Sequence, residues 1–139
     1  MGYSVDRFYH LYNRGNNRGP IFFNQEHRRY FIQQARRYFE PAGIALLAHC
    51  LMENHFHFVV KVTRKTNVSN AIRSFSCSYV KSVNKQLRRC GHLYQGDTRS
   101  EEVASGSNLL YVLAYIHANP VMARLVAAPQ LWRYSDYQE

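Results

Sequence analysis

The clearest alternation of apolar and polar residues lies in residues 52–62, around His55 and His57. Successive side chains of a β-strand point to opposite faces, so this alternation predicts a strand with one apolar face toward a core. The apolar face carries Phe56, Phe58, Val60 and Val62. On the opposite face, the Cα atoms of the two histidines would lie about 6.5 Å apart. Parallel imidazoles at this spacing can bind one cation, although two surface histidines that bind nothing share the pattern.

Three other segments have the composition of strands. Residues 4–13 are rich in aromatic residues and end in a turn cluster that begins with Asn13 and Arg14. This cluster fits either a plain surface turn or a nucleic-acid contact. The apolar run Ile44–Leu51 directly precedes the histidine strand, which predicts an antiparallel hairpin turning near residues 52–54. Residues 101–104 predict a last strand at an edge of the sheet.

Two segments show the period of amphipathic helices. Residues 25–39 follow Asn24, a candidate N-cap, and precede Pro41 and Gly43, and the arginines of this helix are expected to face solvent. The i, i+4, i+7 pattern of residues 68–87 predicts a longer helix, for which Gly91 is a candidate left-handed cap. Together with the strands, these helices predict an α+β fold.

Residues 105–119 predict a third helix, with Ser107 or Asn108 as N-cap and Pro120 at its end. Its buried stripe is expected to contain Leu109, Val112, Leu113 and Ile116. A separate row at i, i+4 and i+8 contains Tyr111, Tyr115 and Asn119. This row places a phenol and an amide one turn apart, which suits either a reactive site or an ordinary tyrosine with its hydroxyl at the surface.

The length of 139 residues predicts one domain, residues 1–139. No apolar run approaches the roughly 18 residues of a membrane span. The first residues lack a secretory signal pattern, so a cytoplasmic protein with no membrane partner is expected. The three cysteines are widely spaced and odd in number, which argues against a disulfide framework and a thiolate metal site.

The net charge of +9, from 18 basic and 9 acidic residues, favours a polyanionic partner. Between Lys61 and Arg99, Asp97 is the only acidic residue, so the cations of the second helix lack acidic partners at i, i+4. Such a cationic stripe suits a phosphate backbone better than a solvated face. The candidate DNA-binding residues are Asn13, Arg14, Arg73, Lys81, Lys85, Arg88, Arg89 and, by base stacking from a loop, Tyr94.

Four motifs occur in the order of a known family. They are Asn13-Arg14-Gly15, Met52-Glu53-Asn54-His55-Phe56-His57, Gly91-His92-Leu93-Tyr94-Gln95-Gly96 and Tyr115-Ile116-His117-Ala118-Asn119-Pro120-Val121. With these motifs, most of the sequence resembles the single-tyrosine transposases that carry a His-hydrophobe-His motif, and among them the REP-associated tyrosine transposases. Each motif alone is unspecific, whereas four in order are specific.

The resemblance implies a ferredoxin-like antiparallel β-sheet packed with α-helices. It also implies a metal-dependent nuclease and strand transferase that acts on single-stranded or hairpin DNA, as a monomer or homodimer. By the same match, His55, His57 and Asn119 are expected as ligands of Mg²⁺ or Mn²⁺, which keeps open positions for a phosphate. Tyr115 is expected as the nucleophile, and its attack would give a 5′-phosphotyrosine and a free 3′-hydroxyl.

The chain differs from the family pattern at Asp97, where the family usually has a basic residue. This difference removes the basis for predicting a DNA contact at that position. Tyr111, four residues before Tyr115, also resembles the paired tyrosines of related replication initiators. A two-tyrosine mechanism is therefore an alternative.

Two other functions fit the same residues. In the first, the fold and its basic helix bind a DNA or RNA hairpin, and the histidines bind no metal. Such a domain would not nick DNA, so an assay for metal-dependent nicking distinguishes it from a nuclease. In the second, His55 and His57 form a zinc hydrolase site with His49 or His117, which predicts bound zinc and no covalent DNA adduct.

Overall fold

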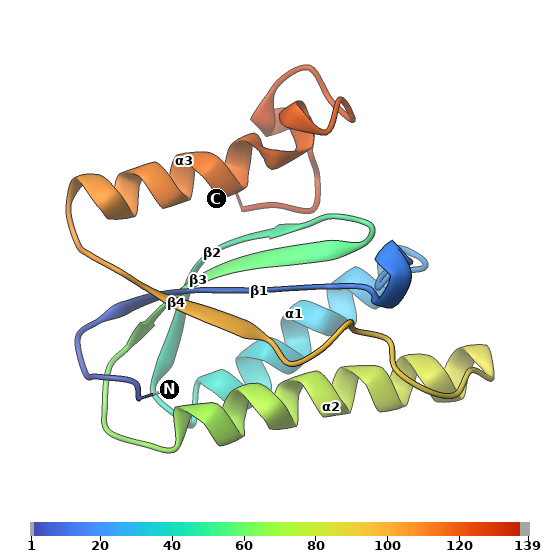
Figure 1. Ribbon diagram of the computed structural model, residues 1–139, viewed down its shortest axis with the longest axis horizontal. Coiled ribbons are helices and arrows are strands. Elements are labelled where there is room, and N and C mark those ends of the chain that lie inside the picture. Colours follow the sequence, from blue (N-terminus) through green and yellow to red (C-terminus); the bar gives the residue numbers. More distant parts are fainter. Residues whose placement is uncertain (1, 137–139) are drawn as a thin grey trace.

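A computed structural model describes residues 2–136 as a four-stranded antiparallel sheet with three α-helices (Figure 1). The elements in chain order are β1 (Phe8–Arg14), α1 (Gln25–Phe39), β2 (Ile44–Leu51), β3 (His55–Val62), α2 (Val68–Leu87), β4 (Arg99–Val103) and α3 (Ser107–Met122). Short 3₁₀ turns follow β1 (Asn16–Arg18) and α3 (Pro129–Leu131). The strand order β2-β3-β1-β4, with α1 and α2 as crossovers, is the ferredoxin-like arrangement. The predicted fold class is therefore confirmed.

The main core lies between the sheet and the pair α1 and α2, which cover the same face (Figure 1). Phe31 of α1 is fully buried at its centre and contacts the rings of Phe56 and Phe58 from β3, and Phe75 and Tyr79 from α2. These contacts confirm that the even-numbered apolar residues of β3 form the core face. Aromatic rings of this size bury large apolar areas and stabilise the packing of sheet on helices.

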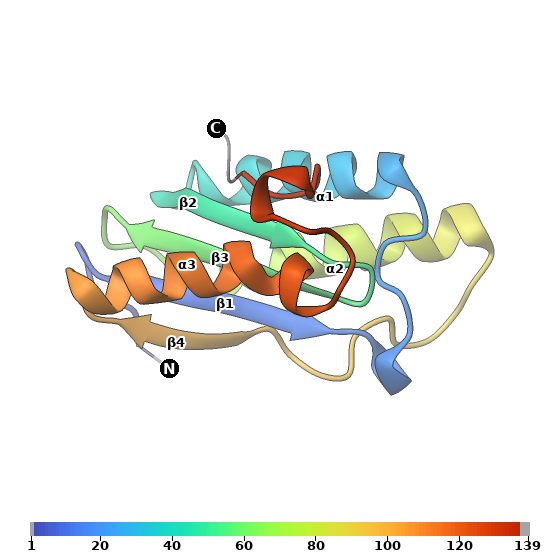
Figure 2. The same ribbon diagram turned by 90° about the horizontal axis from the view of Figure 1, so that it is seen from above.

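Of the three α-helices in residues 2–136, α3 is the one that lies over the opposite face of the sheet, as the view from above shows (Figure 2). A second, small core joins Ile116 of α3 to Ala48 of β2 and Val59 of β3. The predicted buried stripe of α3 packs here, but only Ile116 of that stripe is fully buried. The α3 side of the sheet thus keeps open space beside the helix.

The bounds of β1, β3 and β4 and the cap of α2 need correction. β3 begins at His55, because residues 52–54 form the turn that joins it to β2. β1 begins at Phe8, because a turn at residues 5–6 places Asp6 in the left-handed region at φ 64°. β4 begins at Arg99, which pairs with Tyr12 of β1. The left-handed cap of α2 is Arg88, at φ 54°, rather than Gly91. β2 and α1 have the predicted bounds, and Asn24 caps α1 by accepting from the N–H of His27.

The third helix starts after Gly106 and continues through Pro120 to Met122, so both predicted ends were wrong. A proline removes one intrahelical N–H, and here it does so in the last turn, where the helix is least disturbed. The N–H of Ala123 still donates to the carbonyl of Asn119, at 2.9 Å. Asn119 therefore lies within the helix, one turn after Tyr115. None of the helices in residues 2–136 has the length and apolar character that a membrane span requires.

Candidate active site

An open cleft of about 1010 Å³ lies on the α3 side of the sheet. Its walls come from β1, β3, β4, α3 and the loop that contains Gln95, Gly96 and Asp97. The cleft brings together the four residues to which the resemblance assigns chemistry, His55, His57, Tyr115 and Asn119. The first two come from β3 and the other two from α3, so only the tertiary fold makes them neighbours.

His55 and His57 point into this cleft because β3 turns its intervening phenylalanine to the core. Their ring centroids are 5.2 Å apart. His57 is only 8% exposed, and burial, with smaller effects from the neighbouring His10 and His55, lowers its pKa to about 3. Burial also lowers the pKa of His55. Both rings are therefore neutral at neutral pH, which is the form of histidine that binds a metal.

The two ring nitrogens of His55 each face an amide oxygen. Its Nδ1 lies 2.8 Å from Oδ1 of Asn54, and its Nε2 lies 2.9 Å from Oδ1 of Asn119. A neutral imidazole has one N–H, so it can donate to only one of these two oxygens. When Nδ1–H donates to Asn54, the lone pair at Nε2 faces the oxygen of Asn119.

Such a pair of facing acceptors suits a cation that both can bind. Ligands in neighbouring positions of an octahedral Mg²⁺ site, at about 2.1 Å from the ion, are about 3.0 Å apart. The observed 2.9 Å between His55 Nε2 and Asn119 Oδ1 agrees with this separation. The hydrogen bond to Asn54 is the outer contact that typically holds a ligating histidine in one tautomer. The residues present therefore fit a divalent ion.

The two tyrosines of α3 both line the cleft but differ in position. The ring of Tyr115 meets the ring of His57 edge to face, with centroids 5.8 Å apart. Tyr115 is 41% exposed, whereas Tyr111 is 73% exposed, one turn earlier on the helix. Tyr115 is thus held against the histidines and still open to a substrate.

Several residues of the cleft were not predicted from the sequence. The most important is His10 of β1, whose Nε2 lies 2.9 Å from Nδ1 of His57. Next to it, the hydroxyl of Tyr12 donates to the carboxylate of Glu101, at 2.8 Å. The alternation of buried Tyr9 and Leu11 with the residues between them was the signal that could have placed His10 on the histidine face.

Arg14 and Asn13, the predicted contacts from the first motif, have different environments. Arg14 is exposed at the cleft, and its Nε donates to Oε1 of Gln95. Asn13 is buried, donates its amide N–H to the carbonyl of Gly96 at 2.9 Å, and accepts from the N–H of Arg14. Its amide therefore holds the loop in place at the wall of the cleft. Gly15 completes this turn, because an added Cβ would lie 1.9 Å from the carbonyl oxygen of Gly19.

Tyr94 is 8% exposed and packs in the main core, near Phe56. Its ring is not displayed for stacking on a base. The alternation signal was absent here, because the loop segment has no regular period. Burial raises the pKa of Tyr94 well above its usual range, so the phenol stays neutral in the core.

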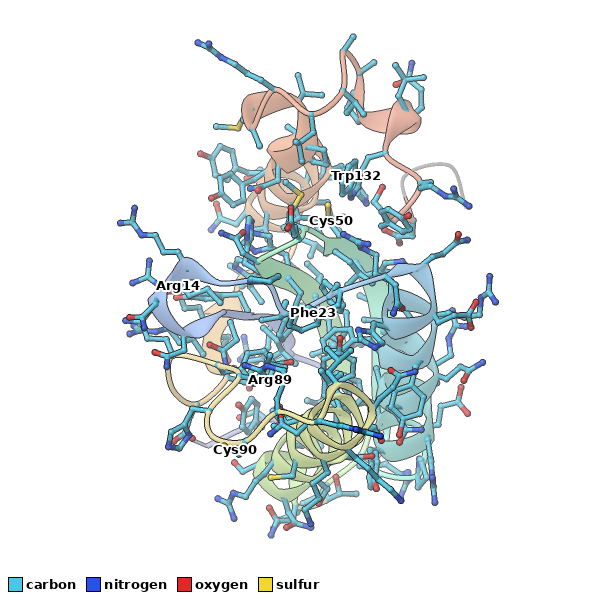
Figure 3. The ribbon with its side chains drawn as sticks, turned by 90° about the vertical axis from the view of Figure 1, so that its right-hand side faces the viewer. Arg14, Phe23, Cys50, Arg89, Cys90 and Trp132 are labelled. Carbon is cyan, nitrogen blue, oxygen red and sulfur yellow. The ribbon has the colours of Figure 1, made fainter. Side chains whose placement is uncertain are left out.

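The structure does not bring the predicted cations of α2 to the cleft, since α2 covers the other face of the sheet (Figure 1). Arg89 lies over the ring of Phe23 at 5.6 Å and donates to Oδ1 of Asn84, so it has internal partners (Figure 3). The remaining four are exposed, namely Arg73, Lys81, Lys85 and Arg88. The cations that line the cleft are Arg14 with Arg18 and Arg99, and sequence reasoning missed the last two as site residues.

Residues 2–136 contain no group of three His, Cys, Asp or Glu side chains that could hold a metal ion. His117 instead forms a hydrogen bond with Asp136, with 2.7 Å between Nε2 and Oδ1. The same carboxylate accepts from the backbone N–H of His49. In the part of the chain that the structure describes, no third histidine, cysteine or carboxylate therefore joins His55 and His57 as the zinc hydrolase interpretation requires.

Comparisons with known proteins agree with this geometry. Among solved structures, a REP-associated tyrosine transposase bound to a REP hairpin superposes with a TM-score of 0.82 at 15% identity, covering 99% of this chain and 80% of that one. A Deinococcus radiodurans R1 protein described as a transposase superposes with a TM-score of 0.58 at 17% identity, covering 84% of this chain and 92% of that one. At such low sequence identities, the two superpositions show similarity of fold alone. No curated protein sequence matches. The family model of the IS200-like transposases matches residues 4–119, so the chain belongs to the IS200-like transposase family.

Proposed function

We propose that the protein is a divalent-metal-dependent transposase that cuts and rejoins single-stranded DNA beside hairpins, with Tyr115 as nucleophile. The observation that carries this proposal is the convergence of α3 and β3. Tyr115 meets His57 at 5.8 Å between ring centroids, and Asn119 meets His55 at 2.9 Å between polar atoms. Family membership supports DNA transposition. The similar structure bound to a REP hairpin supports hairpin DNA as the substrate class.

His55 and His57 would hold the ion through neutral ring nitrogens, and Asn119 would hold it through its amide oxygen. When bound, Mg²⁺ or Mn²⁺ supplies a positive charge that polarises the scissile phosphate and stabilises the departing oxygen. Burial keeps the two imidazoles neutral by lowering their pKa values, so no proton competes for those nitrogens at neutral pH.

Tyr115 would lose its phenolic proton and form a bond from its oxygen to phosphorus. The bond between phosphorus and the 3′-oxygen breaks, and that oxygen takes up a proton to leave a free 3′-hydroxyl. The product is a 5′-phosphotyrosine, whose attack by a second 3′-hydroxyl rejoins DNA without ATP. All four residues come from one chain, so we propose that each subunit can use its own tyrosine.

Cations at the cleft would hold the strand by its phosphates. Arg14, Arg18 and Arg99 line the cleft, and we propose them as the contacts nearest to the cut. The stripe on α2 remains a proposed second contact, for DNA that reaches the opposite face of the sheet. Asp97 also lines the cleft, and its negative charge disfavours a phosphate at that position.

The deciding experiment incubates the protein with labelled DNA hairpins that carry single-stranded flanks, with Mg²⁺ or with a chelator. We expect a denaturation-resistant adduct only with metal. Tyr115→Phe removes one hydroxyl and should abolish the adduct, while Tyr111→Phe is the matched control and should retain it. An adduct mapped to Tyr111 by mass spectrometry would contradict the assignment. Tight hairpin binding without any adduct in Mg²⁺ or Mn²⁺ would favour the non-catalytic nucleic-acid-binding domain instead.

A further inference from the structure

His10 lies directly behind His57, on the side away from His55. In the register of β1 and β3, Tyr12 pairs with His57 and His10 pairs with Val59, so His10 is the diagonal neighbour of His57 on the same face. The rings are stacked with centroids 5.1 Å apart. The neighbouring strand β4 places Glu101 opposite His10, and this carboxylate accepts from the hydroxyl of Tyr12. His10 is therefore held between two strands and an aromatic neighbour.

The hydrogen bond between these rings joins Nε2 of His10 to Nδ1 of His57, at 2.9 Å. His57 is buried and His10 is partly buried. When both rings are neutral, one of these two nitrogens carries a proton and donates it, and the other accepts. Two arrangements are possible. Either His57 donates from Nδ1 and keeps a lone pair at Nε2, or His10 donates and His57 carries its proton at Nε2.

Only the first arrangement leaves His57 able to bind a cation in the cleft through Nε2. In that arrangement His10 accepts the proton of His57, as a carboxylate or carbonyl does behind a ligating histidine. Asn54 provides the matching acceptor for Nδ1–H of His55, at 2.8 Å. The two histidines of β3 thus have one outer acceptor each, one amide and one imidazole.

We propose that His10 is a positioning residue whose Nε2 accepts from His57 Nδ1–H and thereby directs the Nε2 lone pair of His57 into the cleft. The inference rests on the proposed function, because it assigns His57 as a ligand. It adds a residue that lies outside the four sequence motifs. Loss of an outer partner of this kind typically weakens metal binding about 10- to 100-fold.

The test measures the Kd for Mn²⁺ without DNA, by electron paramagnetic resonance of the free ion. His10→Phe keeps a planar ring but removes the acceptor, and we expect Mn²⁺ affinity to fall about 10- to 100-fold. His10→Gln places an amide oxygen near the former Nε2 and should recover most of that loss. As a control, His92→Phe, in an exposed loop, should leave Mn²⁺ affinity unchanged. If His10→Phe does not fold, His10→Asn, which is too short to reach His57, takes its place.

A second readout reports the tautomer itself. In ¹⁵N NMR spectra of the Mg²⁺-loaded protein, His57 should carry its proton at Nδ1. A proton at Nε2 of His57 in that form, or equal Mn²⁺ affinity of the wild type and His10→Phe, would overturn the role of His10. If the wild type still forms its metal-dependent DNA adduct in that case, the proposed function stands. A wild type that binds no Mn²⁺ would overturn the metal-dependent function, and the role of His10 with it.

Discussion

Acidification without metal should destabilise the fold through His57. Burial, with smaller contributions from His10 and His55, lowers the pKa of this imidazole from 6.5 to about 3. In the unfolded chain the ring is solvated and takes up a proton near pH 6.5, while the folded protein keeps it neutral until the pH is near 3. Between these values the unfolded state binds more protons, so the free energy of unfolding must fall as the pH falls.

The magnitude follows from the distance between the two pKa values. Each pH unit within this window changes the free energy of unfolding by about 1.4 kcal/mol per group. From pH 6.5 to about pH 5, His57 alone should therefore remove about 2 kcal/mol of stability. At about pH 7.5 and above, the ring is neutral in nearly all folded and unfolded molecules, so its effect on stability no longer changes with pH. His10 and His55, whose pKa values burial also lowers, would add to the loss.

Urea unfolding in a chelator, at about pH 7.5 and about pH 5, measures this loss. The wild type should lose at least about 2 kcal/mol on acidification, and His57→Asn should lose about 2 kcal/mol less than the wild type. His92→Asn, in an exposed loop, is the matched control and should follow the wild type. Equal losses in the wild type and His57→Asn would refute the reasoning, because His57 would then not be held neutral by the fold.

Three further predictions concern the site, the DNA contacts and the core. Asn119→Ala should reduce nicking less than loss of either cleft histidine, and Mn²⁺ should restore part of the activity in the same adduct assay, because an amide is the most replaceable ligand. Arg14→Gln and Arg99→Gln should each weaken single-strand binding and flatten its salt dependence by about one unit of slope or less, measured by fluorescence anisotropy. Lys65→Gln, in the exposed loop between β3 and α2, is their control and should leave both quantities unchanged. An effect of Lys81→Gln would support the proposed second contact on α2. Phe31→Ala should cost about 3–5 kcal/mol of stability in urea unfolding, because it leaves a cavity among five aromatic rings.

Local patterns in the sequence were enough to determine most of the elements. The alternation around His55 determined which face of β3 is core, because a strand has only two faces. Asn24 determined the start of α1, because its side chain satisfies a backbone N–H of the first turn. Prediction failed at Pro120, since a proline in the last turn loses only one hydrogen bond and α3 continues to Met122.

The site itself depended on contacts that no local pattern contains. The i, i+4 spacing of Tyr115 and Asn119 placed them on one side of α3, but only the packing of Ile116 against the sheet turned that side toward His55 and His57. Strand pairing, which depends on the whole sheet, brought His10 to within hydrogen-bonding distance of His57. The packing of α2 on the sheet also placed the basic stripe of this helix away from the cleft, because a helix that buries its apolar side against one face of a sheet cannot reach the opposite face.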